Sequence, residues 1–270
     1  YLRAAIQLVF FLFLPSAFTT AFSGIKSVLT QIGAGNPIAW SSFLTVLLAL
    51  CAYTIVFGRF FCGYACAFGT LGDAVHSLYL FLCKKCKKKP LLLKKSWKKP
   101  LSYLKYAVLL AVVLLCFLGV YGDLTGWSPW DVFSMLRSGN FKVGAYWLGC
   151  ILLVLILVGM VFCERFFCRF LCPMGAVFSL LPILPFFSVR RKREKCAKGC
   201  TACEKVCPSD LSLPEDGSWN VSGDCFQCQK CLEICPKKNA KSSIRNFRGN
   251  EIWFTLLRAV VLAAVLILAG

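Results

Sequence analysis

The chain has 270 residues, 58% of them hydrophobic, and its mean hydropathy is +0.70. Soluble domains contain roughly 45–50% apolar residues, so the composition argues against a soluble single-domain enzyme. Its 31 Lys and Arg residues outnumber 12 Asp and Glu residues and give a formal net charge of +19. We expect no nucleic-acid partner for this charge, because nucleic-acid-binding domains are not mostly Leu, Phe and Val. The combination favours a membrane protein with basic cytoplasmic loops.

Five apolar stretches are long enough to cross a hydrocarbon core of about 30 Å. They lie near residues 2–22, 40–58, 103–122, 145–163 and 252–270. Lys and Arg are concentrated between them: segments 59–105 and 165–248 hold 26, whereas 23–39 and 123–144 hold three. The positive-inside rule therefore predicts that the two basic segments and the amino terminus are cytoplasmic.

The second and fourth stretches end in the same motif. R-F-F-C-x-x-x-C-x-x-G occurs at 59–69 and again at 165–175, an offset of 106 residues. Two Cys, an Arg and a Gly in register indicate a duplicated hairpin, covering 40–75 and 145–180. We expect each pair, Cys62 with Cys66 and Cys168 with Cys172, to share one face of a helix. The four thiols together could bind an iron–sulfur cluster or another metal; the alternative is that they are small packing residues.

The remaining isolated thiols and the one histidine are less informative. Cys83 and Cys86 form a C-x-x-C pair in a Lys-rich run, which could be redox-active or half of a metal site. His76, the only histidine, is expected to have a plain interfacial role. We interpret Cys51, Cys116 and Cys150, inside apolar stretches, as packing residues.

Two ferredoxin-like cysteine runs lie close together after the fourth stretch. Residues 225–236 read C-x-x-C-x-x-C-x-x-x-C-P, the spacing of a [4Fe–4S] site. Residues 196–208 have one extra residue before the second Cys, which Gly199 could absorb. In two-cluster ferredoxins the fourth Cys of each run ligates the other cluster. We therefore predict one cluster on Cys196, Cys200, Cys203 and Cys235, and another on Cys225, Cys228, Cys231 and Cys207. Zinc is disfavoured, because neither run has the form of two C-x-x-C pairs.

These patterns predict an α-helical integral membrane protein with about five transmembrane helices, built from two tandem hairpin repeats. A cytoplasmic two-cluster ferredoxin-like domain is inserted before the last helix. The predicted divisions are a transmembrane domain at 1–189, the ferredoxin-like domain at 190–250 and a final transmembrane helix at 251–270.

The repeated Arg-Phe-Phe-Cys-x-x-x-Cys motif, Pro173 after Cys172 and the double ferredoxin run resemble the NapH/NosR family of membrane-bound polyferredoxins. The resemblance covers about residues 40–240. It implies electron transfer in a prokaryotic cell or inner membrane, with the motif cysteines on the cytoplasmic side. Two features depart from the family: Ala67 replaces the first motif's Pro, and the first ferredoxin run is one residue long. In NosR-type proteins a flavin-binding domain precedes the spans, so we expect any extracytoplasmic flavoprotein here to be a separate subunit or a further segment.

The leading hypothesis is an electron-transfer component of an oxidoreductase system. Electrons would pass between a cytoplasmic donor, such as a ferredoxin, flavodoxin or reductase, and the two [4Fe–4S] clusters. They would continue through a centre at the repeat cysteines toward an extracytoplasmic flavin or other redox subunit. One alternative is electron exchange with a quinone inside the membrane lipid, without crossing. The other is a copper-reducing assembly factor for a metalloenzyme, since thiolates suit Cu(I).

Overall fold

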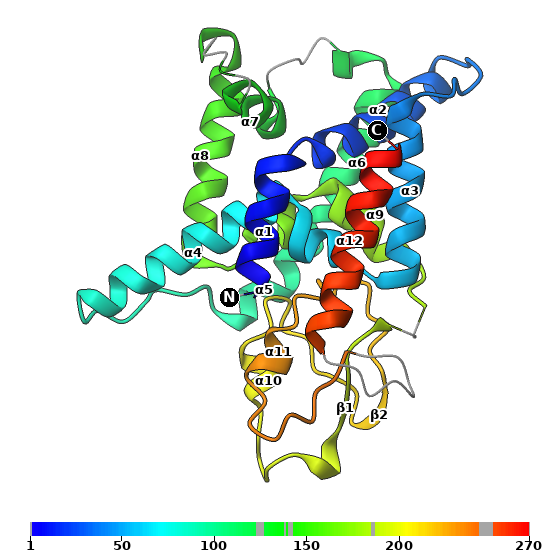
Figure 1. Ribbon diagram of the computed structural model, residues 1–270. Coiled ribbons are helices and arrows are strands. Elements are labelled where there is room, and N and C mark those ends of the chain that lie inside the picture. The colour runs from blue at the N-terminus through cyan, green and yellow to red at the C-terminus, as the bar shows by residue number, and fades with distance from the viewer. Residues whose placement is uncertain are drawn as a thin grey trace.

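The computed structural model describes residues 2–122, 127–137, 139, 143–184, 187–242 and 251–269. Helices fill one end of the molecule, and the ferredoxin segment, which begins at residue 190 and precedes α12, lies below them (Figure 1). The helices of the upper part are α1 (Leu2–Phe13), α2 (Ala17–Gly33), α3 (Ser42–Phe57), α4 (Ala67–Lys85), α5 (Lys95–Leu101), α6 (Leu104–Phe117), α7 (Pro129–Arg137), α8 (Trp147–Phe162), α9 (Pro173–Leu180) and α12 (Glu251–Ala269). Short π-helices η1 (Phe61–Ala65) and η4 (Phe167–Leu171) and 3-10 turns η2 (Val120–Gly122) and η3 (Val143–Tyr146) join them.

Apolar helices mark the chain as a membrane protein. Within the described residues, two helical stretches are long and apolar enough to cross a membrane: 22 residues over Ser96–Phe117 and 19 over Glu251–Ala269. The apolar helices α3 and α8 have 16 residues each. Between α1 and α2 the axis bends by 62°. The stretch predicted to span near 2–22 is therefore a bent pair of helices that extends to Gly33; Pro15, which lacks an N–H, lies in the break.

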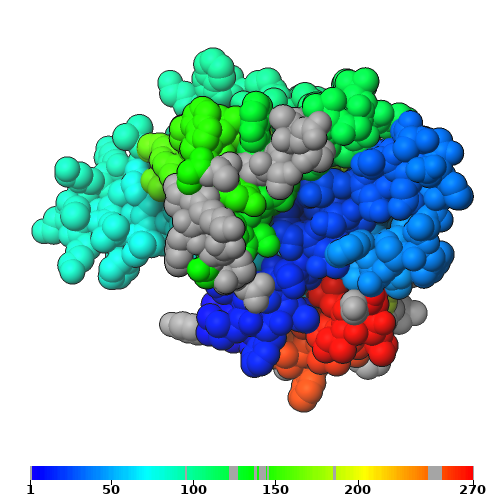
Figure 2. Space-filling view, turned by 90° about the horizontal axis from the view of Figure 1, so that it is seen from above, coloured from blue at the N-terminus to red at the C-terminus, as the bar shows by residue number. Residues whose placement is uncertain are grey.

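The ends of the chain lie at opposite ends of the helices. The amino terminus is close to the ferredoxin segment, whereas α12 starts beside that segment and ends at the far side (Figure 1). Seen from above, the helices hide almost all of the ferredoxin segment, and the stretch around α4 projects from the body (Figure 2). Arg258 of α12 is buried and donates from Nη2 to Ser242 Oγ at 2.8 Å, which ties the last helix to the ferredoxin segment.

The ferredoxin segment has little regular structure and a very small apolar core. Strand β1 (Arg190–Lys192) pairs antiparallel with β2 (Asp216–Trp219), with Arg190 opposite Trp219. The short η6 (Arg193–Lys195), α10 (Ala202–Lys205) and α11 (Lys230–Glu233) complete it. Its buried cluster contains only Val189, Cys203, Leu213 and Ala240 among the described residues. Ligation rather than hydrophobic burial is the natural source of stability for such a segment.

Candidate iron–sulfur sites

One small cavity of the ferredoxin segment collects the four cysteines predicted for the second cluster. Its lining includes Cys207, Cys225, Cys228 and Cys231, together with Cys203 of the other predicted set. Burial, together with the nearby Cys228 and Cys207 thiols, raises the pKa of Cys225 to about 12. Such thiols keep their protons until a metal displaces them. A cavity enclosed by clustered thiols fits an iron–sulfur cluster.

Asn239 forms hydrogen bonds to two cysteines predicted to hold the first cluster, Cys196 and Cys235. The backbone N–H of Asn239 donates to Cys235 Sγ at 3.3 Å, and its Nδ2 donates to Cys196 Sγ, also at 3.3 Å. Burial alone would raise the pKa of Cys235, but backbone hydrogen bonds, led by that of Ala240, outweigh it and lower the pKa. The two runs therefore meet at this amide, in surroundings that favour a thiolate at Cys235.

Two arginines approach the middle of the same set. Arg191 is buried and donates from Nη1 to Cys203 Sγ at 2.9 Å. Arg193 Nη1 donates to the carbonyl oxygen of Cys200 at 2.8 Å. A donor to a ligating sulfur is one of the levers by which a protein sets the reduction potential of a cluster.

The repeat cysteines lie where two π-helices end. Cys62 belongs to η1 and Cys168 to η4, while Cys66 and Cys172 have extended backbone, with ψ of 123° and 114°, and begin α4 and α9. The expectation that each pair shares one α-helical face is therefore wrong, because the helical register changes inside each pair. The Cys172 sulfur also accepts a hydrogen bond from Gly175 N at 3.2 Å. Single π-turns of this kind are frequent at functional sites.

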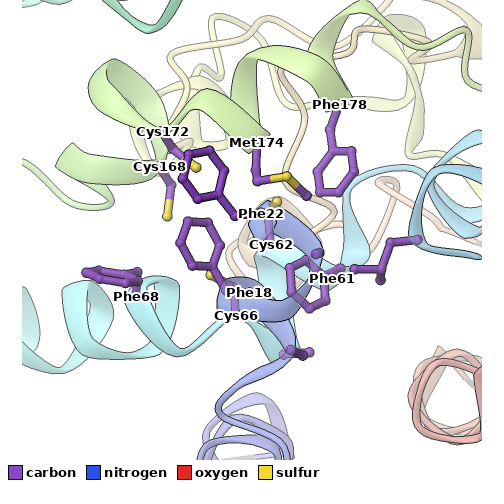
Figure 3. Close-up of a cluster of buried hydrophobic side chains, with 14 of the residues drawn as sticks. Phe18, Phe22, Phe61, Cys62, Cys66, Phe68, Cys168, Cys172, Met174 and Phe178 are labelled. Atoms are coloured by element: carbon purple, nitrogen blue, oxygen red, sulfur yellow. The ribbon is translucent and has the colours of Figure 1, made fainter. Parts of the chain in front are cut away.

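All four repeat thiols lie in one buried cluster (Figure 3). Each side chain is at most 6% exposed. The Cys168 thiol lies close to that of Cys66, and Cys172 is close enough to interact with both Cys168 and Cys62. Phe18, Phe22 and Met174 surround them. Folding thus brings together four thiols from copies that are 106 residues apart in the sequence.

No single metal ion has a ready site in the described ranges. There, no group of three or more His, Cys, Asp and Glu side chains is arranged to hold one ion. A [4Fe–4S] cluster contains four irons, and each iron takes its own thiolate. The ligands of such a cluster therefore surround a body and do not converge on a point.

Each repeat copy sends its arginine into the other copy. Arg165 donates to the carbonyl oxygen of Cys62, and its Nη2 donates to that of Gly63 at 2.8 Å. A Cβ on Gly69 would lie 2.8 Å from the Cys62 oxygen and 3.5 Å from Arg165 Nη1. The repeated spacing between motif Cys and Gly thus has a physical reason within this chain: Gly69 leaves room for the Cys62 carbonyl oxygen that accepts from Arg165.

Arg59 of the first copy reaches into the second copy in a similar way, but some of its N–H donors have no acceptor. A Cβ on Gly175 would lie 2.9 Å from Arg59 Nη2 and 3.0 Å from the Cys168 oxygen. Arg59 is 1% exposed, and its Nε and Nη2 have no hydrogen-bond partner in the described part of the chain. Cys62 and Cys172 are among its nearest neighbours. A buried cation with spare donors beside four thiols fits a negatively charged, thiolate-ligated cluster.

Asp73 is a site residue that the sequence motifs did not reveal. It accepts hydrogen bonds from Arg165 Nη2 at 2.6 Å and Gln7 Nε2 at 2.7 Å, and it pairs with Arg3. The available signal was a lone carboxylate four residues after the motif glycine, in an otherwise apolar stretch of α4. Asp73, in the first copy, thus balances the positive charge of Arg165 from the second copy.

The loop between Cys225 and Cys228 docks on the first copy. The Phe226 ring has Arg59 at 4.7 Å and Arg165 at 5.2 Å from its centroid. A Cβ on Gly63 would lie only 2.3 Å from the Phe226 backbone oxygen. The backbones of the repeat and of the ferredoxin loop are therefore in direct contact, and Gly63 is what permits it.

The less specific thiols occupy varied positions. Cys83 is half-buried and Cys86 is exposed at the end of α4, and a redox role for them stays a prediction. His76 is buried, and its Nδ1 lies 3.0 Å from the Val161 oxygen, which accounts for it as a packed, hydrogen-bonded side chain. Cys51, Cys116 and Cys150 lie within α3, α6 and α8 and contribute to the apolar core.

Comparisons of the sequence with known proteins identify its family. A family model described as a 4Fe-4S binding domain matches residues 39–100 and 145–193, the two segments that carry the repeated motif. An uncharacterized protein of Methanocaldococcus jannaschii is 31% identical over 237 residues, which are 87% of this chain and 90% of the relative. The ferredoxin-type protein NapH of Haemophilus influenzae is 27% identical, over 74% of this chain and 67% of its own. This chain belongs to the NapH/NosR-type polyferredoxin family.

Family membership confirms the resemblance inferred from the cysteine motifs and makes the chain an iron–sulfur electron transport protein. The regulatory protein NosR of Stutzerimonas stutzeri is 26% identical over 79% of this chain, but that match covers only 30% of NosR. No solved structure matches the chain. The 4Fe-4S match ends at residue 193, before Cys196, so it falls on the repeat motif and not on the ferredoxin runs.

Proposed function

We propose that this polyferredoxin holds three centres in series and passes electrons between a cytoplasmic donor and the membrane. The cluster farthest from the helices would be held by Cys196, Cys200, Cys203 and Cys235. The nearer ferredoxin cluster would be held by Cys207, Cys225, Cys228 and Cys231, and the third centre by Cys62, Cys66, Cys168 and Cys172. When bound, these clusters supply one-electron redox chemistry.

The observation that carries the proposal is the contact between the nearer ligand loop and the repeat. Phe226 sits between Arg59 and Arg165, and its backbone touches Gly63, next to Cys62. The second copy makes a matching contact, since Arg169 Nη1 donates to the oxygen of Pro208, which follows Cys207. Both repeat copies thus contact residues that adjoin ligands of the same predicted cluster. That is the arrangement expected if this cluster exchanges electrons with the repeat thiols.

The family match supports a ligand role for the repeat cysteines over a packing role, because a 4Fe-4S binding model covers both motif segments.

The proposed orientation in the membrane rests on the basic residues and on the fold. The amino terminus and the ferredoxin segment share one end of the helices, so we propose that this end is cytoplasmic. Crossings at α1–α2, α3, α6, α8 and α12 would then give five spans, with the acceptor, a flavin or other redox subunit, on the opposite side.

Anaerobic purification with iron analysis and paramagnetic resonance tests the third centre. We expect Cys62→Ser and Cys168→Ser to abolish the same spectroscopic signal, because one shared site depends on both copies. The two ferredoxin clusters, about eight irons, should remain in both variants. Cys150→Ser, in the apolar stretch of α8, is the matched control and should leave every signal intact. A Cys62, Cys66, Cys168 and Cys172 quadruple Ser variant that keeps its full iron content would contradict the proposal.

A further inference from the structure

A large cavity lined by several charged residues lies where the ferredoxin segment meets the start of α6, and no cysteine lines it. Its volume is about 620 Å³. The lining comes from the turn between α3 and η1, from α5, the start of α6, η4 and two ferredoxin loops: Arg59, Ser96, Lys99, Ser102, Tyr103, Lys105, Arg169, Ser209, Asp210, Leu211, Asp224 and Phe226. The cavity adjoins the one that collects the nearer cluster's predicted ligands, because Ser209, Leu211 and Phe226 line both.

The cavity carries an excess of positive charge. Asp224 is shared by Lys105 and by Arg59, whose Nη1 lies 3.7 Å from it. Asp210 is likewise shared by Arg169, at 2.7 Å, and Lys98, at 3.5 Å.

Lys99 adds a further cation to the lining, and it forms no ion pair with any residue in the described ranges. Two carboxylates therefore face five cations at this junction. Lysine and arginine groups left in excess around a cavity of this size are the donors that recognise a phosphate group.

The position of the cavity favours a lipid over a soluble phosphate compound. It opens beside α6, part of a stretch apolar and long enough to cross a membrane. Tyr103, at the start of that stretch, is 65% exposed, and Leu110 and Leu114 are both more than half exposed. A headgroup in the cavity would thus leave its acyl chains beside an apolar, outward-facing helix. Basic pockets at the cytoplasmic ends of membrane helices are known receptors for anionic headgroups.

We propose that this cavity binds the headgroup of an anionic phospholipid and that the bound lipid fastens the ferredoxin segment to the foot of α6. The phosphate contacts come from Lys99, Lys105 and Arg169. Hydroxyl groups of Ser96, Ser102 and Tyr103 provide further donors. None of these residues is a predicted cluster ligand, although Arg169 also holds the Pro208 oxygen beside Cys207.

The test uses the full chain, delipidated in detergent and mixed with phosphatidylglycerol or phosphatidylcholine of identical acyl chains, with bound lipid counted by native mass spectrometry. Phosphatidylglycerol should be retained at least tenfold better. Lys99→Gln should weaken its retention about fivefold, since one lysine near an anionic headgroup contributes about 1 kcal/mol. Ser96→Trp should also weaken it by filling the cavity without changing any charge. Thermal unfolding verifies that both variants are folded.

Lys88→Gln is the matched control, because Lys88 is exposed in the same basic segment but does not line the cavity. Its effect should stay below twofold. An equal loss in Lys88→Gln and Lys99→Gln would overturn the proposal in favour of general charge attraction. Equal retention of the two lipids would overturn it as well. Glycerol 3-phosphate competing as strongly as phosphatidylglycerol would overturn the lipid assignment and identify a soluble phosphate ligand instead.

Discussion

The two repeat copies share a motif and a backbone but use equivalent positions for different contacts. Position 63 is Gly, and its lack of a side chain admits the Phe226 backbone; the equivalent position 169 is Arg, which binds the Pro208 oxygen and Asp210. One copy makes room for a ferredoxin loop, and the other holds a second loop with a charged side chain. Duplication therefore preserved the thiol arrangement, while the contacts around it diverged to fit an asymmetric ferredoxin segment.

The largest expected effect is a difference in stability between variants of Arg165 and Arg59, the two arginines that reach into the other repeat copy. Arg165→Gln leaves Asp73, whose side chain is only 13% exposed, without its principal partner, and we expect a loss of about 3–5 kcal/mol in stability. Arg59→Gln should cost only about 1 kcal/mol, because Asp224 is 46% exposed and keeps Lys105. Thermal unfolding of the full chain in detergent measures both. Equal losses would mean that the two crossings are equivalent.

A smaller effect is expected from closing the gap at position 63. Gly63→Ala places a methyl group 2.3 Å from the Phe226 oxygen, so the ferredoxin loop must move away from the repeat. We expect a destabilisation of about 1–3 kcal/mol and a lower iron content after purification. Gly144→Ala is the control, since a Cβ there meets no atom within 4 Å. The contact would be unimportant if both variants unfold at the same temperature.

The smallest effect concerns the position after the second motif cysteine, where the first copy has Ala67 and the second has Pro173. Pro173 begins α9, whereas Ala67 begins α4 after a residue with φ −67° and ψ 123°. That backbone is compatible with a following proline. We expect Ala67→Pro to stabilise the protein by about 0.5 kcal/mol and Pro173→Ala to cost a similar amount, measured by thermal unfolding. A large loss in Ala67→Pro would show that the first copy has no space for the ring.

Sequence patterns were most informative where chemistry fixes spacing. The duplicated R-F-F-C-x-x-x-C-x-x-G motif identified the four thiols that fold into one cluster and led to the correct family. The same patterns could not reveal the π-helices, because two thiols four residues apart are compatible with an α-helical turn and with a π-helical turn. They also missed Asp73 and Phe226, whose partners lie 92 residues away in one case and across a segment boundary in the other. The break between α1 and α2 did have a signal in the sequence, Pro15, which hydropathy alone does not register.

The crossing of Arg165 into the first copy has a consequence for biosynthesis. The Cys62 oxygen and its arginine are 103 residues apart, so the first copy emerges from the ribosome long before its partner exists. Until then Asp73 and the carbonyl groups around Cys62 lack their principal cation. The nascent first hairpin is therefore an incomplete folding unit, and assembly of the shared thiol site must wait until translation has passed the second motif.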